Sequence, residues 1–348
     1  MKNCIEYLKN LKKIDMRDKK ALHKIINEAA KNVMPLDFPI YSIHFELTTK
    51  CNALCRHCYN NSGNNDENDL MTTTNWINFA KYIVKKGGVF ECLISGGEPL
   101  LLGDRLFDIM DVLHGDGSIF VLMTNGYLLN DKNIDRFAQY RFRWFQISID
   151  GVNEEYHDYF RNLNGCWKSA VNAAREISKK GIPLKIAHCV TPYNIDQIDL
   201  MCELANDIGC DELLCGGISI SGRAFLNKEF VLNKEQQKFL KFKIEENREK
   251  FKNKMWIKGA NSVKMGLENR GKRTHPFAVI RPNGDVKIDG MAPFVIGNIL
   301  KDDFLEIWKN RVLQSWKTEV VRDYIDNFSE EDVNYSFVNY VDEDFRIY

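Results

Sequence analysis

Short apolar runs alternate with amphipathic stretches along residues 41–215. The runs have the length and composition of buried strands, and the stretches between them repeat apolar residues at helical spacing. The pattern predicts strands at 41–47, 90–94, 119–123, 144–149, 184–190 and 212–215, and helices at 74–86, 106–113, 131–138, 166–180 and 196–208. Strands that are apolar throughout are typical of a parallel sheet whose two faces are both covered.

Six such strand–helix units between residues 41 and 250 predict an α/β fold, a partial (β/α)6 barrel. An open doubly wound sheet is the alternative. In both architectures the carboxyl ends of the strands meet at one edge, so we expect reactive side chains there. Helix termini are also indicated, with Thr73 or Thr74 as an N-cap and Gly181 as a left-handed C-cap.

The chain changes character on both sides of this repeat. Residues 1–40 form a helical lead-in, with Leu22, Ile25, Ile26 and Ala29 at helical spacing. Residues 255–348 predict a small α+β extension, with two strands in 277–288 around a Pro-Asn-Gly-Asp turn and helices at 303–308 and 312–324. The expected domains are therefore 1–40, 41–250 and 255–348. The acidic, aromatic segment from residue 326 gives no assignment.

Charge and hydropathy exclude several classes of protein. The 48 Lys and Arg balance the 48 Asp and Glu, which argues against a basic nucleic-acid surface and against a polybasic membrane anchor. The longest wholly apolar runs span about five residues, too few to cross a bilayer. The first twenty residues mix charged and apolar side chains without the apolar core of a secretory signal. We expect a soluble cytoplasmic protein.

Three of the ten cysteines, Cys51, Cys55 and Cys58, follow the first predicted strand directly. Three thiolates in one loop can converge on a soft metal centre. A closed zinc site needs four ligands, and His57 is poorly placed as the fourth because it is adjacent to Cys58. A four-iron cluster can be held by three thiolates, which leaves one iron open to a small molecule. Unconnected cysteines or a degenerate zinc loop are the alternatives.

The spacing C-x3-C-x2-C resembles the signature of the radical S-adenosylmethionine (SAM) superfamily. Further motifs resemble those of the same family, in chain order and at strand ends. They are Ser95-Gly-Gly-Glu-Pro99, Thr124-Asn-Gly126, Ser148-Ile-Asp-Gly151, His157-Asp-x-x-Arg161, Val190-Thr-Pro-Tyr-Asn194 and Gly222-Arg-Ala224. The resemblance covers residues 41–225. It implies a 4Fe-4S cluster that reductively cleaves SAM to a 5′-deoxyadenosyl radical, which then removes a hydrogen atom from a substrate.

The resemblance also implies roles for individual residues. The cluster ligands would be Cys51, Cys55 and Cys58. The residues expected around SAM are Gly96, Gly97 and Glu98 at its ammonium group, Ser148, Asp150 and Asn125 at the ribose, Arg161 at the carboxylate and Tyr59 near the adenine. Each has a plain structural alternative: a turn for the glycines and Asn125, a helix cap for Ser148 and Asp150, a surface arginine, and simple packing of Tyr59.

The C-terminal part resembles the SPASM or twitch extension of radical SAM peptide maturases. Such extensions usually carry cysteines for auxiliary clusters, whereas this chain has no cysteine after Cys215. Thr274-His275 and Asp289-Gly290 stand where the ligands are expected, so we predict no auxiliary cluster. This favours redox-neutral outcomes such as epimerisation or rearrangement, or cross-linking with another electron sink. Epimerisation requires a hydrogen-atom donor, and Cys215 at the end of the sixth strand is the candidate, with a packed core thiol as the alternative.

The family analogy favours a ribosomally made peptide as the substrate. A small molecule such as a sugar or a nucleoside is the alternative, and a non-catalytic metal-binding barrel is a second one. The chemistry implied by the resemblance also requires a one-electron donor, for which flavodoxin or ferredoxin is expected.

Overall fold

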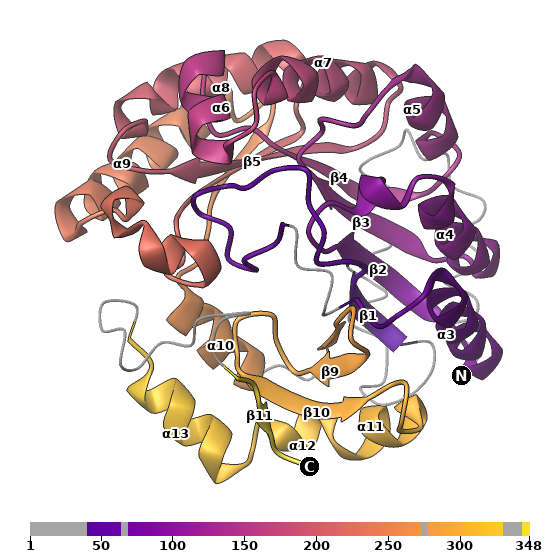
Figure 1. Ribbon diagram of the computed structural model, residues 1–348. Coiled ribbons are helices and arrows are strands. Elements are labelled where there is room, and N and C mark those ends of the chain that lie inside the picture. The colour runs from indigo at the N-terminus through magenta and orange to yellow at the C-terminus, as the bar shows by residue number, and fades with distance from the viewer. Residues whose placement is uncertain (1–39, 64–68, 273–276, 330–342) are drawn as a thin grey trace.

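A computed structural model of the chain describes residues 40–63, 69–272, 277–329 and 343–348. The expected lead-in helix and the pair Thr274-His275 lie outside these ranges. The described strands form one eleven-stranded sheet, in the order β11-β10-β9-β8-β1-β2-β3-β4-β5-β6-β7. Figure 1 shows this sheet curving around a central opening, with the helices that follow β2 to β6 on its outer side.

The strands from β8 through β1 to β7 all run parallel. Their bounds are β1 Ile40–Glu46, β2 Val89–Ser95, β3 Ile119–Thr124, β4 Phe142–Ser148, β5 Leu184–Val190, β6 Glu212–Gly217, β7 Trp256–Gly259 and β8 Phe277–Ile280. The six predicted strands are therefore present, and the prediction of a partial α/β barrel is confirmed. The sheet also extends beyond the six units, because β7 joins β6 and β8 joins β1.

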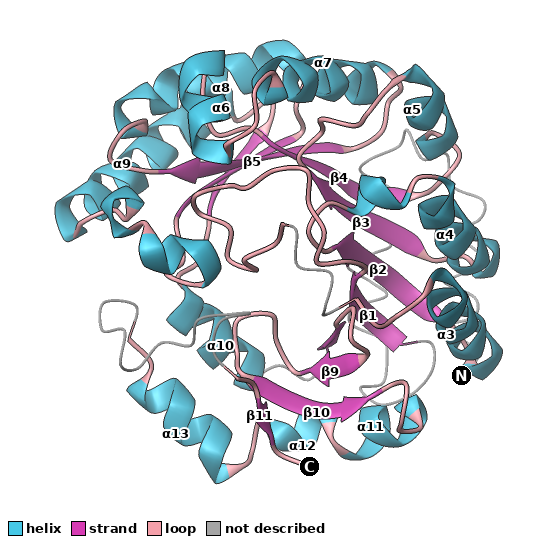
Figure 2. Ribbon diagram, in the orientation of Figure 1, coloured by secondary structure: helices cyan, strands magenta, loops and turns pink. Residues whose placement is uncertain are grey.

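Helices cover the outer face of the parallel strands (Figure 2). Their bounds are α3 Thr73–Lys86, α4 Asp104–Asp116, α5 Asp131–Phe137, α6 Glu154–Arg161, α7 Cys166–Lys179, α8 Ile198–Ile208, α9 Lys234–Phe251 and α10 Val263–Gly271. The N-cap of α3 is Thr72, not Thr73 or Thr74, because the Thr72 hydroxyl accepts from the Asn75 amide in a capping box. Gly181 follows α7 with a φ of 72°, as predicted.

The C-terminal extension completes the sheet at its β1 edge. The predicted hairpin is present as β8 and β9 (Asp285–Lys287), followed by β10 (Phe294–Asn298) and α11 (Phe304–Asn310). The single helix expected at 312–324 is wrong: α12 (Val312–Ser315) ends in a turn where the Thr318 hydroxyl donates to the Ser315 carbonyl, and α13 begins anew at Glu319–Asn327. Phe345–Arg346 forms β11, which pairs in parallel with β10.

Alternation along the strands separates a core side from an inner side. On β5, Leu184, Ile186 and Val190 are fully buried in the apolar core, whereas Lys185, Ala187 and Cys189 are only half-buried. Successive strand residues point to opposite faces, so the half-buried positions line the inside of the barrel. Side chains at the carboxyl ends of these inner rows face the same region as the loop after β1.

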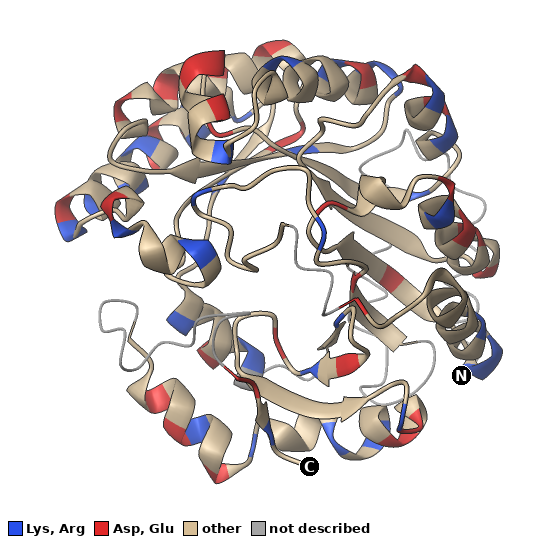
Figure 3. Ribbon diagram, in the orientation of Figure 1, with Lys and Arg blue, Asp and Glu red and all other residues tan. Residues whose placement is uncertain are grey.

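Charged side chains of both signs are interspersed over the outer helices (Figure 3). In the described part of the chain, none of the helices is long and apolar enough to span a bilayer. The mixture of charges on the outer helices agrees with the even charge balance of the sequence.

Candidate functional site

The cysteine loop, residues 47–63, follows β1 and crosses the central opening of the barrel (Figure 1). Cys55 is buried, and Cys51 and Cys58 are partly exposed. Each sulfur faces one N–H donor: the Ala53 amide lies 3.5 Å from the Cys51 Sγ, the Ser62 amide 3.4 Å from the Cys58 Sγ, and the Arg161 Nη1 3.9 Å from the Cys55 Sγ. Donors directed at sulfur stabilise thiolate and are the usual surroundings of metal-bound cysteine.

Burial disfavours ionisation of the Cys51 and Cys55 thiols. Burial raises the pKa of Cys51 to about 12 and that of Cys55 to about 11, and the neighbouring sulfurs add to both shifts. Metal ligation replaces these protons, since the thiolate is the ligand. No three His, Cys, Asp or Glu side chains of the described residues meet closely enough for a single ion. A four-iron cluster does not require this, because each thiolate binds its own iron.

Gly96 and Gly97 lie where the end of β2 touches the start of the cysteine loop. A Cβ on Gly96 would lie 2.5 Å from the Thr48 carbonyl oxygen, and one on Gly97 would lie 2.1 Å from the Lys50 carbonyl oxygen. The Gly97 amide also donates to Thr48 at 2.6 Å. The glycines are therefore required by this backbone contact. Their expected role at the SAM ammonium group stays a prediction.

Glu98 and Asn125 connect the ends of β2 and β3 to the same loop. Glu98 is fully buried and accepts from the Asn125 amide and the Thr124 hydroxyl, both at 2.8 Å, and from the Leu100 amide at 3.1 Å. Burial raises the pKa of Glu98, and these donors partly offset the effect. The Asn125 side chain donates to the Asn52 Oδ1 at 2.8 Å. The structure therefore brings Glu98 and Asn125 to the cysteine loop.

Asp150 and Arg161 form a buried ion pair at the end of β4. The Arg161 Nε and Nη2 lie 2.8 Å and 2.7 Å from the Asp150 Oδ2, and the Cys189 amide donates to Oδ1 at 2.8 Å. Burial alone would raise the pKa of Asp150, but Arg161 outweighs it and holds the pKa well below its usual range. The sequence analysis assigned both residues to SAM, whereas the structure pairs them with each other and directs the free Nη1 of Arg161 toward Cys55.

Ser148, Tyr59 and His57 lie in three different surroundings. Ser148 is half-buried at the end of β4, on the inner side by alternation with the core residue Ile147. Tyr59 lies on the side of the loop that faces the extension, where burial, and then the Glu46 carboxylate, raise the pKa of its phenol. His57 stacks on Phe160 with ring centroids 4.0 Å apart.

Cys215 is not brought to this group. It is fully buried and belongs to the apolar core together with Leu213, two residues earlier on β6. Both residues therefore point toward the helices. The thiol that lies on the inner side is Cys189, which is half-buried at the end of β5. The expected role of Cys215 as a hydrogen-atom donor stays a prediction that this placement does not support.

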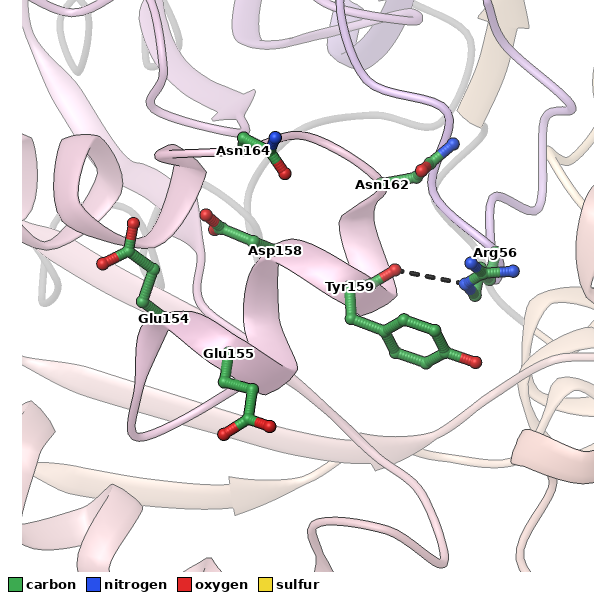
Figure 4. A pocket seen from close by; sticks show the side chains of 7 residues that line it. All are labelled: Arg56, Glu154, Glu155, Asp158, Tyr159, Asn162 and Asn164. Carbon is green, nitrogen blue, oxygen red and sulfur yellow. Dashed lines mark hydrogen bonds between the residues drawn. The ribbon is translucent and has the colours of Figure 1, made fainter.

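A polar cavity of about 470 Å³ lies beside α6 (Figure 4). Its walls carry acidic and amide side chains together with one cation: Arg56, Glu154, Glu155, Asp158, Tyr159, Asn162 and Asn164. The Arg56 Nε donates to the Tyr159 carbonyl at 3.1 Å, and its guanidinium lies over the Tyr159 ring. None of the predicted site residues lines this cavity. The contacts of Arg56 with Tyr159 in its wall hold the cysteine loop to α6.

Sequence reasoning missed one residue that contacts the loop extensively. Arg223, in the short 3-10 helix Gly222–Leu226 after β6, donates to the carbonyls of Cys55 and Cys58. Its position in a motif after the sixth strand was visible, but nothing in the sequence showed which segment it would bind.

The fold and the site together define an α/β partial barrel with a three-cysteine loop at the carboxyl ends of its strands. Residues 45–205 match the family model described as "Radical SAM superfamily". The chain therefore contains a radical SAM domain, as the sequence predicts. The family is one of enzymes that use a 4Fe-4S cluster and SAM, which confirms the predicted enzyme class and both cofactors.

The relatives are named for different products, a heme in one case and a bacteriocin in another. The chain is 27% identical to an AdoMet-dependent heme synthase of Methanosarcina barkeri, over 77% of this chain and 82% of the relative. It is 25% identical to the subtilosin biosynthesis protein AlbA of Bacillus subtilis, over 92% of this chain and 70% of the relative. The structure of Streptococcus suis SuiB bound to SAM superposes with a TM-score of 0.65 at 14% identity, covering 86% of this chain and 73% of SuiB.

Proposed function

We propose that this protein is a peptide-modifying radical SAM enzyme that acts on a ribosomally made peptide by epimerisation or cross-linking. The observation that carries the proposal is the match to AlbA, a bacteriocin biosynthesis protein, across 92% of the chain. That match extends beyond the barrel into the C-terminal extension. SuiB, whose fold is similar, has also been solved with its precursor peptide SuiA.

The residues of the barrel mouth fit the two cofactors. Cys51, Cys55 and Cys58 offer three soft sulfur ligands in one loop, and each sulfur already faces an N–H donor. When bound, the cluster and SAM supply the 5′-deoxyadenosyl radical that removes a hydrogen atom from the substrate. The chain's own contribution is to hold the loop in place, to keep the Asp150–Arg161 pair charged, and to exclude water from the reacting groups.

The SAM site is proposed along the carboxyl ends of β2 to β4. It would include Gly96, Gly97, Glu98, Asn125, Ser148, Asp150 and Arg161, with Tyr59 at the adenine. Glu98, Asp150 and Arg161 already have partners in the protein, so they would bind SAM through their remaining hydrogen-bonding capacity. A flavodoxin or ferredoxin would supply the electron.

A small-molecule substrate is the second candidate. The heme synthase relative supports it, because that match covers 77% of the chain and 82% of the relative. Radical SAM chemistry would be the same in both cases, and the two candidates differ only in what occupies the inner side of the barrel. The inner positions of β5 carry a cation, a methyl group and a thiol, from Lys185, Ala187 and Cys189. These groups are compatible with a peptide and with a small molecule.

Anaerobic reconstitution with iron and sulfide tests the proposal. The full chain should become brown, bind about four irons, and release 5′-deoxyadenosine when dithionite and SAM are added. Adding candidate precursor peptides encoded next to the gene should give a product with unchanged mass (epimerisation) or one lighter by two hydrogens (cross-linking). Turnover of a tetrapyrrole or another small molecule, with every peptide unchanged, would replace the first candidate by the second.

A further inference from the structure

Arg223 bonds the cysteine loop at four points. Its backbone amide donates to the Cys58 carbonyl at 2.8 Å, and its Nε donates to the Cys55 carbonyl at 2.9 Å. Its Nη1 donates to the Asn61 Oδ1 at 3.2 Å, and its Nη2 to the Ser62 carbonyl at 2.5 Å. A single residue from the loop after β6 thus spans the segment that carries two of the three cysteines.

The neighbours of Arg223 are shaped for the same contact. Gly222 has a φ of 53°, and a Cβ there would lie 2.3 Å from the Cys58 carbonyl oxygen and 2.5 Å from the Tyr59 carbonyl oxygen. Any larger residue would push the two segments apart. Asn227 adds a further bond, donating to the Arg56 carbonyl at 3.1 Å. The contact is therefore made by a short segment, residues 222–227, against residues 55–62.

The geometry depends on the guanidinium fork. Three of the four bonds come from different nitrogens of one rigid, planar group, which fixes three acceptors relative to one another. A lysine would keep the charge but could not reach these acceptors in the same arrangement. The loop has little regular secondary structure of its own. Among the described residues, its one β-type pairing is an isolated bridge between Lys50 and Gly63.

We propose that Arg223 is a positioning residue that fixes the shape of the cysteine loop and thereby controls how firmly the cluster is retained. This rests on the assignment of Cys51, Cys55 and Cys58 as cluster ligands. Arg223 bonds to carbonyls and an amide oxygen around the cysteines, and none of these bonds uses a sulfur atom. It acts on the cluster through the loop.

The test compares Arg223→Gln and Arg223→Lys with Arg311→Gln in the reconstituted full chain. Arg311 is a matched control, because it is partly buried and donates to the Ile296 carbonyl at 3.0 Å in the extension. Three readouts are used: hydrogen exchange of residues 51–63, the rate of iron loss to a chelator, and the electron paramagnetic resonance spectrum of the reduced cluster. Loss of three charged hydrogen bonds should speed loop exchange and iron loss on the order of tenfold or more in Arg223→Gln.

Arg223→Lys should show a smaller increase together with a shifted resonance spectrum, and Arg311→Gln should match the wild type. Wild-type exchange and iron-loss rates in Arg223→Gln would overturn the proposal. If that variant does not fold, Arg223→Lys decides, and wild-type rates there would overturn it equally. None of these readouts needs SAM or substrate. A wild-type chain that binds no cluster would instead refute the ligand assignment.

Discussion

The cysteine loop and the C-terminal extension both pack polar groups against β1, and they satisfy those groups in opposite ways. In the loop, each of three sulfurs faces one long N–H contact, and burial holds two of the thiols in the protonated form. In the extension, the fully buried Lys287 lies 2.7 Å from the Asp344 carboxylate. In the proposed function, the sulfurs of the loop bind a cluster. The charged groups of the extension instead pair with each other.

The ion pairs of the extension reach back to the barrel. Arg281 pairs with Asp344, and its Nε lies 3.9 Å from the Glu46 carboxylate at the end of β1. Arg346 of β11 binds Asp285 of β9 through one nitrogen, 2.9 Å from both carboxylate oxygens. The last six residues of the chain thus supply charges that the hairpin needs. Apart from Glu46, the residues of this network all lie after Cys215, the last cysteine of the chain.

The largest effect should come from removing a sulfur of the loop. Cys55→Ala should abolish both the brown colour after reconstitution and the formation of 5′-deoxyadenosine, because two thiolates cannot hold the cluster in place. Absorbance near 400 nm, iron content and mass spectrometry of the nucleoside are the measurements. Cys92→Ala is the control, since Cys92 is a fully buried thiol of β2 that takes no part in the loop. Retained SAM cleavage in Cys55→Ala would refute the ligand assignment.

Breaking the buried ion pair beside the loop should have the next largest effect. Asp150→Asn leaves the Arg161 guanidinium buried without a counter-charge, which typically costs about 3–5 kcal/mol of unfolding free energy. Urea denaturation of the variant and the wild type measures this loss. The exposed pair Glu203–Lys250 gives the control, because Glu203→Gln should cost only about 0.2–1 kcal/mol. Equal losses in the two variants would show that the Asp150–Arg161 pair contributes no more than a surface pair.

The buried Lys287 of the extension should make the free energy of unfolding depend on pH. Burial first, and then Arg281, lower the pKa of Lys287 to about 8, from 10.5 in the unfolded chain. The unfolded state then binds more protons between these pH values, so stability should rise from pH 8 to 10.5, by about 3 kcal/mol for this group. Lys287→Met should remove this rise, as measured by denaturation at several pH values. Asp344 and Glu46 also face Lys287.

The difference in pH dependence between Lys287→Met and the wild type reports the contribution of Lys287 alone. In the unfolded chain the thiols also lose protons in this range. They do so in both proteins, so their contribution cancels in the difference between wild type and Lys287→Met. An identical pH profile for the two proteins would mean that Lys287 is not desolvated as the structure places it.

The fold was largely predictable because its strands carry a strong pattern. The six predicted strands are present, and none of their ends is shifted by more than two residues. The strand β7 was missed because three of its four residues, Trp256, Lys258 and Gly259, are exposed, so it has no apolar run. The break between α12 and α13 depends on the turn that Thr318 closes, and the helical spacing of apolar residues continues across it.

Only those residues of the candidate site that belong to a sequence motif could be predicted. The cysteines and the strand-end motifs could be assigned from their spacing, but their partners could not. The pairing of Asp150 with Arg161 requires α6 to turn back toward the end of β4, and the contact of Arg223 with the cysteine loop joins residues more than 160 positions apart. The direction of Cys215 was also hidden, because a short strand does not reveal which of its two faces lies inward.

The smallest expected effect distinguishes the two thiols at the ends of β5 and β6. Cys189 is half-buried on the inner side of the barrel, whereas Cys215 is fully buried on the helix side. Burial raises the pKa of both thiols, so both react slowly, and access decides between them. Iodoacetamide labelling of the native chain, read by peptide mass spectrometry, should modify Cys189 before Cys215. Equal labelling in the denatured chain is the control. Earlier labelling of Cys215 would mean that β6 presents its other face to the barrel interior, which would restore Cys215 as the candidate hydrogen-atom donor.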